Sequence, residues 1–500
     1  TPDDLDHLII DNSGAAVEQS GILSDTELTG FGMSGSVVYA GFEDLTLTLG
    51  SAPDVLSLDG TGAATTHVNT GDGGDTIRLF DTIDGSGVGN AATAGSVLTV
   101  DGGDGGDSYI VTVANSVSEA SFIRLHDTGT FGLDTLSYKG SSGNDVIQLD
   151  TVYIRDEDPE REFSQDRWLD YGNHGDGLLI SHFGANSSAY QPVDPSNTNQ
   201  LMNLTTSQLS GAHSFQVLNY TTIELVTIFA GAGDDKIISD DTAQSIDIYG
   251  NEGDDQFYVG SVLASTQVSV EGEVIDVVTE ITHGTSYPMN FYGGDGDDYF
   301  EVNHNQADIA LYGGNGDDTF FIKALLTLDD SQDLVELDNQ TATVSGVSSP
   351  DELPGQQSPV DTREVDLDAL VYVQNANVKI DGGAGFDSVA IVGTVLNDTF
   401  YIFTEIVAGK TVQRIYGAGV KLSELLNIER VQLITGAGDD RVYLLGVDLG
   451  PVADLVINTG AGSDTVYVGN SASENLSFDL KYPTRRRTDY AEIIGFQAGT

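Results

Sequence analysis

A short glycine-rich segment that ends in aspartate recurs ten times along the 500-residue chain. Alternating apolar residues follow each copy, as in GGDGDDYFEV (293–302) and GGNGDDTFFI (313–322). Asp235 and Asp255, which end consecutive copies, lie 20 residues apart. A coil of this length holds two short strands and two turns, and stacked coils place their strands about 4.8 Å apart. Such a period predicts stacked repeats instead of a globule with a single core.

The residues after each motif aspartate follow the two-residue period of a β-strand. The second and fourth residues are apolar and are predicted to point inward: Phe257, Phe300, Phe320, Phe400, Val442 and Val466, with Val259, Val302, Ile322, Ile402, Leu444 and Val468. The third residue should point outward, yet it is often aromatic: Tyr258, Phe321, Tyr401, Tyr443 and Tyr467. Either an insertion or another subunit covers these rings, or they stack across neighbouring strands.

A longer repeat is superimposed on the short one. Segments 41–58, 221–238 and 426–443 align on Glu43, Glu224 and Glu429, and 132–149 aligns with 385–402. We therefore predict three super-repeats, at 1–223, 224–428 and 429–500, with the third truncated. Insertions are expected at about 153–215 and 329–365, where the motif is interrupted. An array that is open at both ends suits a piece of a long fibrous parent.

The charge of the chain restricts its partners. There are 78 acidic and 19 basic residues, which gives a formal net charge of −59. Nucleic acid and anionic membrane surfaces are therefore implausible partners. The absence of cysteine excludes disulfides and thiolate metal sites. No apolar run is long enough for a transmembrane helix, and no signal peptide is visible.

The turns carry the ligand chemistry of a hard cation. Glycine permits positive φ and lets neighbouring backbones approach closely, and the aspartate adds a carboxylate at the same edge. Calcium takes six to eight oxygen ligands, which stacked turns of this kind supply, whereas magnesium prefers octahedral geometry and retains water. Acids one residue before the motif aspartate, at Asp234, Asp254, Asp297, Asp317 and Asp439, are either further ligands or solvated surface groups.

The motif resembles the hemolysin-type (RTX) calcium-binding repeat, G-G-x-G-x-D-x-U-x, and 293–301 and 313–321 match it in full. The resemblance implies a parallel β-roll that binds several Ca²⁺ ions through turn carbonyls and motif aspartates. The family repeats every nine residues, whereas here one edge of each coil usually lacks the motif, so calcium is expected mainly along one edge. The implied ligands are Asp75, Asp107, Asp145, Asp235, Asp255, Asp298, Asp318, Asp387, Asp440 and Asp464.

These observations predict an all-β fold, a right-handed parallel β-helix or β-roll solenoid with Gly/Asp calcium-binding turns and loop insertions. The expected function is an extracellular or cell-surface structural protein that calcium stabilises. It would be a filament or appendage subunit, or a long adhesin, that associates with itself or with sister subunits. Two alternatives remain: a carbohydrate-acting β-helix enzyme of the lyase or epimerase type, and an adhesin module that binds glycans or ice.

Signatures of catalysis are missing from the sequence. H-E-x-x-H, G-x-S-x-G and P-loop motifs are absent, so we expect no enzymatic activity. The basic cluster Arg485-Arg486-Arg487 is interpreted as pairing with an acidic surface. Possible glycosylation sites are the N-x-S/T asparagines Asn186, Asn203, Asn219, Asn339, Asn397 and Asn475.

Overall fold

The computed structural model shows an all-β protein that forms two compact units. Unit 1 comprises Thr1–Gln256 with Tyr287–Tyr292, and unit 2 comprises Phe257–Ser286 with Gly293–Thr500. No α-helix occurs among the described residues, and none of them forms a helix that could cross a membrane. The structure describes residues 5–60, 63, 65–79, 97–112, 120–152, 176–183, 214–270, 273–328, 335–337, 363–364, 369–445 and 454–469.

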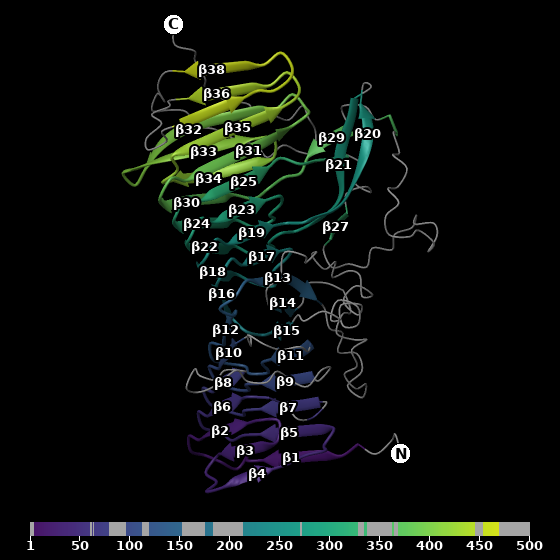
Figure 1. The fold of residues 1–500 in the computed structure, drawn as a ribbon, viewed down its shortest axis with the longest axis vertical. Coiled ribbons are helices and arrows are strands. Elements are labelled where there is room, and N and C mark those ends of the chain that lie inside the picture. Colours follow the sequence, from purple (N-terminus) through teal and green to yellow (C-terminus); the bar gives the residue numbers. More distant parts are fainter. Residues whose placement is uncertain are drawn as a thin grey trace. The chain divides into compact units, whose positions relative to one another are not determined.

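Consecutive strands of unit 1 alternate between two sheets from β5 to β12 (Figure 1). Each strand from β5 to β10 pairs in parallel with the strand two further along the chain. The first sheet contains, in spatial order, β1 (His7–Asp11), β5 (Asp44–Thr48), β7 (Thr65–Asn69), β9 (Val97–Asp101), β11 (Ala120–His126), β15 (Ser214–Thr221), β14 (Asp176–Phe183), β13 (Asp145–Val152) and β17 (Lys236–Ser239). The second contains β4 (Ser36–Val38), β3 (Glu27–Gly30), β2 (Ser20–Leu23), β6 (Val55–Leu58), β8 (Thr76–Leu79), β10 (Ser108–Thr112), β12 (Thr135–Lys139), β16 (Leu225–Ala232), β18 (Ile246–Glu252) and β22 (Met289–Asp295), whose last three residues belong to unit 2.

The parallel register stacks apolar side chains of equivalent position into rows. In the second sheet of unit 1, the paired residues Ile77, Tyr109, Leu136, Val226 and Ile246 form one such row. All five side chains are buried, so each strand of the stack (a rung) shields the side chains of the next strand from water. The core therefore lies between the two sheets and extends along the whole stack.

Antiparallel strands interrupt the stack at two places in unit 1. Strands β2, β3 and β4 form a meander, and β14 pairs antiparallel with both β13 and β15. Strand β14 lies within the first predicted insertion, so this part of the insertion is a member of the sheet. Most of the remaining insertion, 153–175 and 184–213, lies outside the described residues.

Unit 2 repeats the two-sheet arrangement (Figure 1). Its first sheet contains β19 (Gln256–Val259), which begins in unit 1, β23 (Tyr299–Val302), β25 (Thr319–Lys323), β31 (Ser388–Thr394), β35 (Arg430–Gly436) and β37 (Asp454–Asn458). The second contains β24 (Ile309–Asn315), β30 (Val378–Ala384), β34 (Val420–Leu426), β33 (Lys410–Gly417), β32 (Thr399–Val407), β36 (Arg441–Leu445) and β38 (Thr465–Gly469). Here β33 pairs antiparallel with β32 and β34. The parallel pairs are β23–β25, β25–β31, β31–β35, β35–β37, β24–β30, β30–β34, β32–β36 and β36–β38.

The core of unit 2 contains a stack of phenylalanine rings. Phe300 lies 4.6 Å from Phe257 and 4.8 Å from Phe320, measured between ring centroids, and all three rings are buried. The predicted inward positions are buried throughout, with two exceptions in β38. Val466 and Val468 are 42% and 78% exposed. Strand β38 pairs with β36 on one side only among the described residues, so its side chains lack the next rung.

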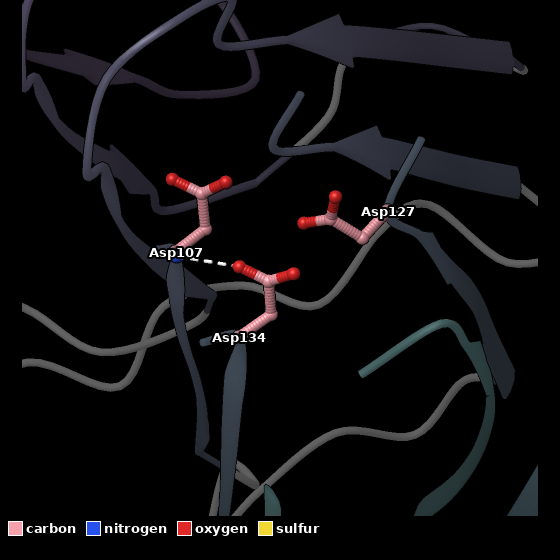
Figure 2. A group of neighbouring side chains, drawn as sticks. All are labelled: Asp107, Asp127 and Asp134. Atoms are coloured by element: carbon pink, nitrogen blue, oxygen red, sulfur yellow. Dashed lines mark hydrogen bonds between the residues drawn. The ribbon is translucent and has the colours of Figure 1, made fainter. Parts of the chain in front are cut away.

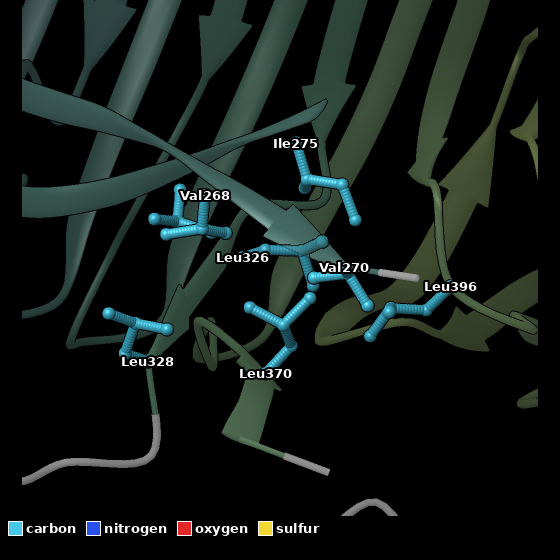
Figure 3. Close-up of a cluster of buried hydrophobic side chains, with 8 residues drawn as sticks. Val268, Val270, Ile275, Leu326, Leu328, Leu370 and Leu396 are labelled. Atoms are coloured by element: carbon cyan, nitrogen blue, oxygen red, sulfur yellow. The ribbon is translucent and has the colours of Figure 1, made fainter. Parts of the chain in front are cut away.

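A hairpin of β20 (Val262–Val270) and β21 (Glu273–Thr282) carries a second apolar cluster (Figure 3). Strands β27 (Val335–Leu337) and β28 (Arg363–Glu364), from the second predicted insertion, pair with this hairpin, while β26 (Leu326–Leu328) pairs with β29 (Leu370–Tyr372). The cluster contains Val268, Val270, Ile275, Val277, Leu326, Leu328, Leu370 and Leu396. Leu396 belongs to a motif turn, so the hairpin packs against the turns of unit 2.

The outward aromatic residues stack on one another across the strands. Tyr443 lies 5.1 Å from Tyr401 and 4.7 Å from Tyr467, with nearly parallel rings. Tyr258 lies 6.0 Å from Tyr299 at a tilted angle, and the ammonium group of Lys323 lies over Phe321. Cross-strand ring contacts therefore account for Tyr258, Tyr401, Tyr443 and Tyr467, whereas Phe321 contacts Lys323 of its own strand.

Candidate metal-binding turns

Each motif turn spans six residues, numbered here so that the aspartate is position six. Position two has positive φ in the glycine turns, with +120° at Gly314 and +105° at Gly383. A Cβ atom on Gly314 would lie 2.2 Å from the carbonyl oxygen of Gly294 in the neighbouring turn. Both the positive φ and the close stacking therefore favour glycine at Gly314.

The position-six aspartates of unit 1 form two rows of hydrogen bonds between neighbouring turns. In each row the backbone N–H of one residue donates to a carboxylate oxygen of the next residue in the row, which is Oδ1 of an aspartate or Oε2 of a glutamate. The first row runs from Gln19 through Asp54, Asp75, Asp107 and Asp134 to Glu224, with N···O distances of 2.7–2.8 Å. The second row joins Asp145, Asp235 and Asp255 at 2.7 and 2.8 Å.

Unit 2 contains the same two kinds of row. One joins Asp298, Asp318, Asp387 and Glu429 at 2.8–2.9 Å, and the other joins Asp398, Asp440 and Asp464 at 2.7 and 3.0 Å. One row in each unit leads into the first sheet and the other leads into the second. Motif aspartates thus line turns at both ends of the strands, whereas the sequence suggested mainly one edge.

Burial leaves these carboxylates in an unfavourable setting for a negative charge. Burial raises the pKa of Asp235 to about 8, and those of Asp107, Asp255 and Asp318 to about 7. Neighbouring carboxylates raise these pKa values further, while the backbone hydrogen bonds oppose the shift. The buried Oδ2 atoms without a hydrogen-bond partner in the described part of the chain include those of Asp54, Asp107, Asp235, Asp318 and Asp387.

Position five forms a similar row in the opposite direction on the outer side of the turns. The Oδ1 atom of Asn144 accepts from the N–H of Asp234, and Oδ1 of Asn397 accepts from that of Asp439. Asp297 accepts in the same way from the N–H of Asp317, at 2.8 Å. These acids therefore have a structural role as backbone acceptors, and asparagine fills it as well as aspartate does.

Three buried aspartates converge where two turns of unit 1 meet (Figure 2). Asp107 and Asp134 end consecutive turns, and Asp127 follows β11 directly. One carboxylate oxygen of each lies within 4.8 Å of the others. The Tyr109 hydroxyl donates to Oδ2 of Asp127 at 2.7 Å and accepts from the N–H of Gly102 at the same distance.

The donor set of this cluster fits a hard divalent cation. All its candidate ligand atoms are carboxylate oxygens, and Oδ2 of Asp107 is buried with no hydrogen-bond partner among the described residues. A Cβ atom on Gly102 would lie 2.6 Å from that atom and 2.7 Å from Oδ2 of Asp127, so glycine keeps space in front of both. Burial raises the pKa of Asp134 to about 6 and also raises that of Asp127. A cation at this position would offset the mutual repulsion of the three carboxylates.

The structure places nine of the ten predicted ligands in buried positions, and Asp464 is half-buried. It brings Asp107 together with two residues that the motif search missed, Asp127 and Asp134. Asp134 ends the degraded turn GTFGLD, so its position six was a usable signal, whereas Asp127 carries no motif at all. Glu224 and Glu429, which the long repeat had aligned, accept equivalent hydrogen bonds at the ends of their rows.

Two of the six candidate glycosylation sites lie in the described residues. Asn219 is buried, and its amide donates to the carbonyl of Gly177, so a glycan there would require the site to open. Asn397 is exposed, although its side-chain oxygen accepts a backbone hydrogen bond. The remaining sites, Asn186, Asn203, Asn339 and Asn475, and the basic cluster 485–487 lie outside the described residues. No protein-family model matches the chain, and no curated protein sequence matches it.

Proposed function

We propose that the chain is an extracellular structural protein, a right-handed parallel β-helix or β-roll solenoid whose coils are joined by Ca²⁺ at the Gly/Asp turns. The alternation of strands between two sheets and the parallel pairing of successive coils support the solenoid. The resemblance of the turns to the hemolysin-type repeat supports calcium as the ion. Millimolar calcium outside cells matches weak, repeated sites of this kind.

The observation that carries the proposal is the rows of buried, closely spaced carboxylates, in which Oδ2 of Asp107, Asp235 and Asp318 has no hydrogen-bond partner among the described residues. The chain has too few basic residues to neutralise these groups, with 19 against 78 acids. Burying an unpaired charge is costly, so the rows need protons or cations at neutral pH. Calcium bound between two turns would neutralise both carboxylates and connect the coils that carry them.

The proposed biological role is a filament or appendage subunit, or a long adhesin, without catalytic activity. The exposed apolar side chains of β38 and the free side of this strand among the described residues favour association with a sister subunit. Such an interface would extend the stack from one chain to the next.

A glycan-binding role for the outward tyrosines is the second candidate, and the geometry argues against it. Sugars pack against the faces of aromatic rings, but Tyr401, Tyr443 and Tyr467 already stack face to face. The rings of Tyr401 and Tyr467 therefore cover both faces of Tyr443.

Circular dichroism and thermal melting of the full chain, titrated with calcium and then with EGTA, test the proposal. We expect calcium to raise the melting temperature and the β signal, and magnesium to do so weakly. Equal responses to both ions, or no response to either, would remove calcium from the mechanism. Electron microscopy of the calcium-loaded chain tests the filament role separately, since calcium-stabilised monomers at all concentrations would contradict it.

A further inference from the structure

At Asp145, Asp398 and Asp440, a hydroxyl group of the same turn donates a hydrogen bond to the motif aspartate. The Ser141 hydroxyl donates to Oδ1 of Asp145 at 2.7 Å, and the Thr394 hydroxyl donates to Oδ1 of Asp398 at 2.9 Å. The Thr435 hydroxyl donates to Oδ2 of Asp440. We call these three turns closed. We call open the turns of Asp54, Asp107, Asp235, Asp318 and Asp387, whose buried Oδ2 atoms have no hydrogen-bond partner in the part of the chain that the structure describes.

Position two explains how two of the closed turns are formed. Ser141 and Thr394 occupy this position and do not have the positive φ of the glycine turns. Their backbone N–H groups consequently point at the aspartate and donate to Oδ2 of Asp145 and of Asp398, both at 2.6 Å. Both oxygens of each carboxylate are thus satisfied within the turn, and Tyr372 donates a further hydrogen bond to Asp398.

The open turns leave a different environment around the carboxylate. Oδ1 of Asp318 accepts the N–H of Asp298 at 2.9 Å, but its Oδ2 faces Gly313, where a Cβ atom would lie only 2.0 Å away. A Cβ atom built on Gly382 would likewise lie 2.5 Å from Oδ2 of Asp387. Glycine at positions one and two therefore supplies neither a hydroxyl nor a suitably directed N–H to this oxygen.

From this contrast we infer that the open turns bind calcium, whereas the closed turns of Asp145, Asp398 and Asp440 bind none. The closed turns of Asp145 and Asp398 also start their aspartate rows, because the described structure gives them no carboxylate-to-amide bond from a preceding turn. Asp145 and Asp398 lie at equivalent places in the aligned segments 132–149 and 385–402, so a closed turn starts an aspartate row in both segments. At the start of these two rows, a hydroxyl group and a backbone N–H group satisfy the carboxylate without a cation.

This inference rests on the proposed function, and counting bound ions in the full chain tests the two separately. Wild type and variants are equilibrated with calcium by dialysis, and the bound metal is measured by mass spectrometry. Asp318→Asn and Asp145→Asn are a matched pair, since both aspartates are buried and end their turns. We expect Asp318→Asn to lose at least one ion per chain and Asp145→Asn to retain the wild-type number.

A gain of binding provides the second arm. Ser141→Gly removes the hydroxyl and permits positive φ, so we expect one additional calcium ion per chain in a variant whose circular dichroism is unchanged. Loss of an ion in Asp145→Asn, or an unchanged count in a folded Ser141→Gly chain, would overturn the inference. If the wild type binds no calcium at all, the proposed function fails instead.

Discussion

Asp235 offers the sharpest test of what the buried carboxylates require. Its Oδ1 atom accepts the N–H of Asp145 at 2.7 Å, while its buried Oδ2 atom has no hydrogen-bond partner among the described residues. Asparagine keeps the Oδ1 acceptor and removes the charge. We expect Asp235→Asn to stabilise the calcium-free protein and to destabilise the calcium-bound protein, so that the sign of its effect depends on the ion.

The magnitude follows from the pKa of this group. Burial, opposed by one backbone hydrogen bond and reinforced by neighbouring carboxylates, raises the pKa of Asp235 from 3.8 to about 8. Keeping the group protonated at pH 7, about three pH units above its ordinary pKa, costs about 4 kcal/mol of folding free energy. Asparagine avoids this cost but buries an amide N–H₂ group, which loses about 1–3 kcal/mol if unpaired. The net stabilisation of the calcium-free protein should be about 1–3 kcal/mol.

Denaturant unfolding at pH 7, in EGTA and in saturating calcium, measures both effects. The control is Asp234→Asn, which removes the same charge from the exposed neighbouring position. It should change stability little in EGTA. If Asp235→Asn destabilises the calcium-free protein, the buried carboxylate is not an electrostatic cost, and the argument for a neutralising cation is refuted.

Three further outcomes follow from the same geometry. In EGTA the unfolding free energy should fall as the pH rises from about 4 to 8, because burial raises the folded-state pKa values of Asp107 and Asp255 to about 7, above their unfolded values. Thermal melting at pH 5 and pH 8 checks the sign of this change. Saturating calcium should remove the pH dependence. Tyr109→Phe should lower the unfolding free energy measured with denaturant by about 1–3 kcal/mol, since it removes the hydroxyl that bonds to both Asp127 and Gly102. An unchanged unfolding free energy would mean that this hydroxyl does not stabilise the protein. Phe300→Ala should lower the unfolding free energy by about 3–5 kcal/mol equally with and without calcium, because it breaks the ring stack in the core of unit 2 and removes no carboxylate. A loss that depends on calcium would contradict the separation between core packing and ion binding.

The local part of the fold was predictable from the sequence. The two-residue period after each motif aspartate predicted which side chains are buried, as at Phe300 and Phe320, because strand periodicity is a local property. It failed at Val466 and Val468, since burial there depends on a neighbouring rung, which periodicity does not report. The long repeat aligned Glu224 with Glu429, and both accept the N–H of an aspartate in the preceding turn.

The site was less predictable because its members come from different turns. Asp127 lies 20 residues after Asp107, with strands β10 and β11 between them, and only the stacking of turns places them together. The Tyr109 hydroxyl was also invisible, because its position in the strand marks it simply as a core residue. The pairing of each Oδ1 with a backbone amide likewise depends on the register between coils, for which no single turn contains a signal.

Positions five and six of the turns differ in whether hydrogen bonding explains the presence of a charged side chain. At position five, Asn144 and Asp297 accept a backbone N–H equally, so this hydrogen bond alone does not require a carboxylate. In a closed turn both oxygens of the aspartate accept hydrogen bonds, which an asparagine amide cannot do, and a carboxylate is needed there for hydrogen bonding. In an open turn only Oδ1 accepts one, and asparagine would suffice, yet Asp235 and Asp318 bring a buried charge. A charge that hydrogen bonding does not need, and that burial penalises, is accounted for if a cation binds beside it.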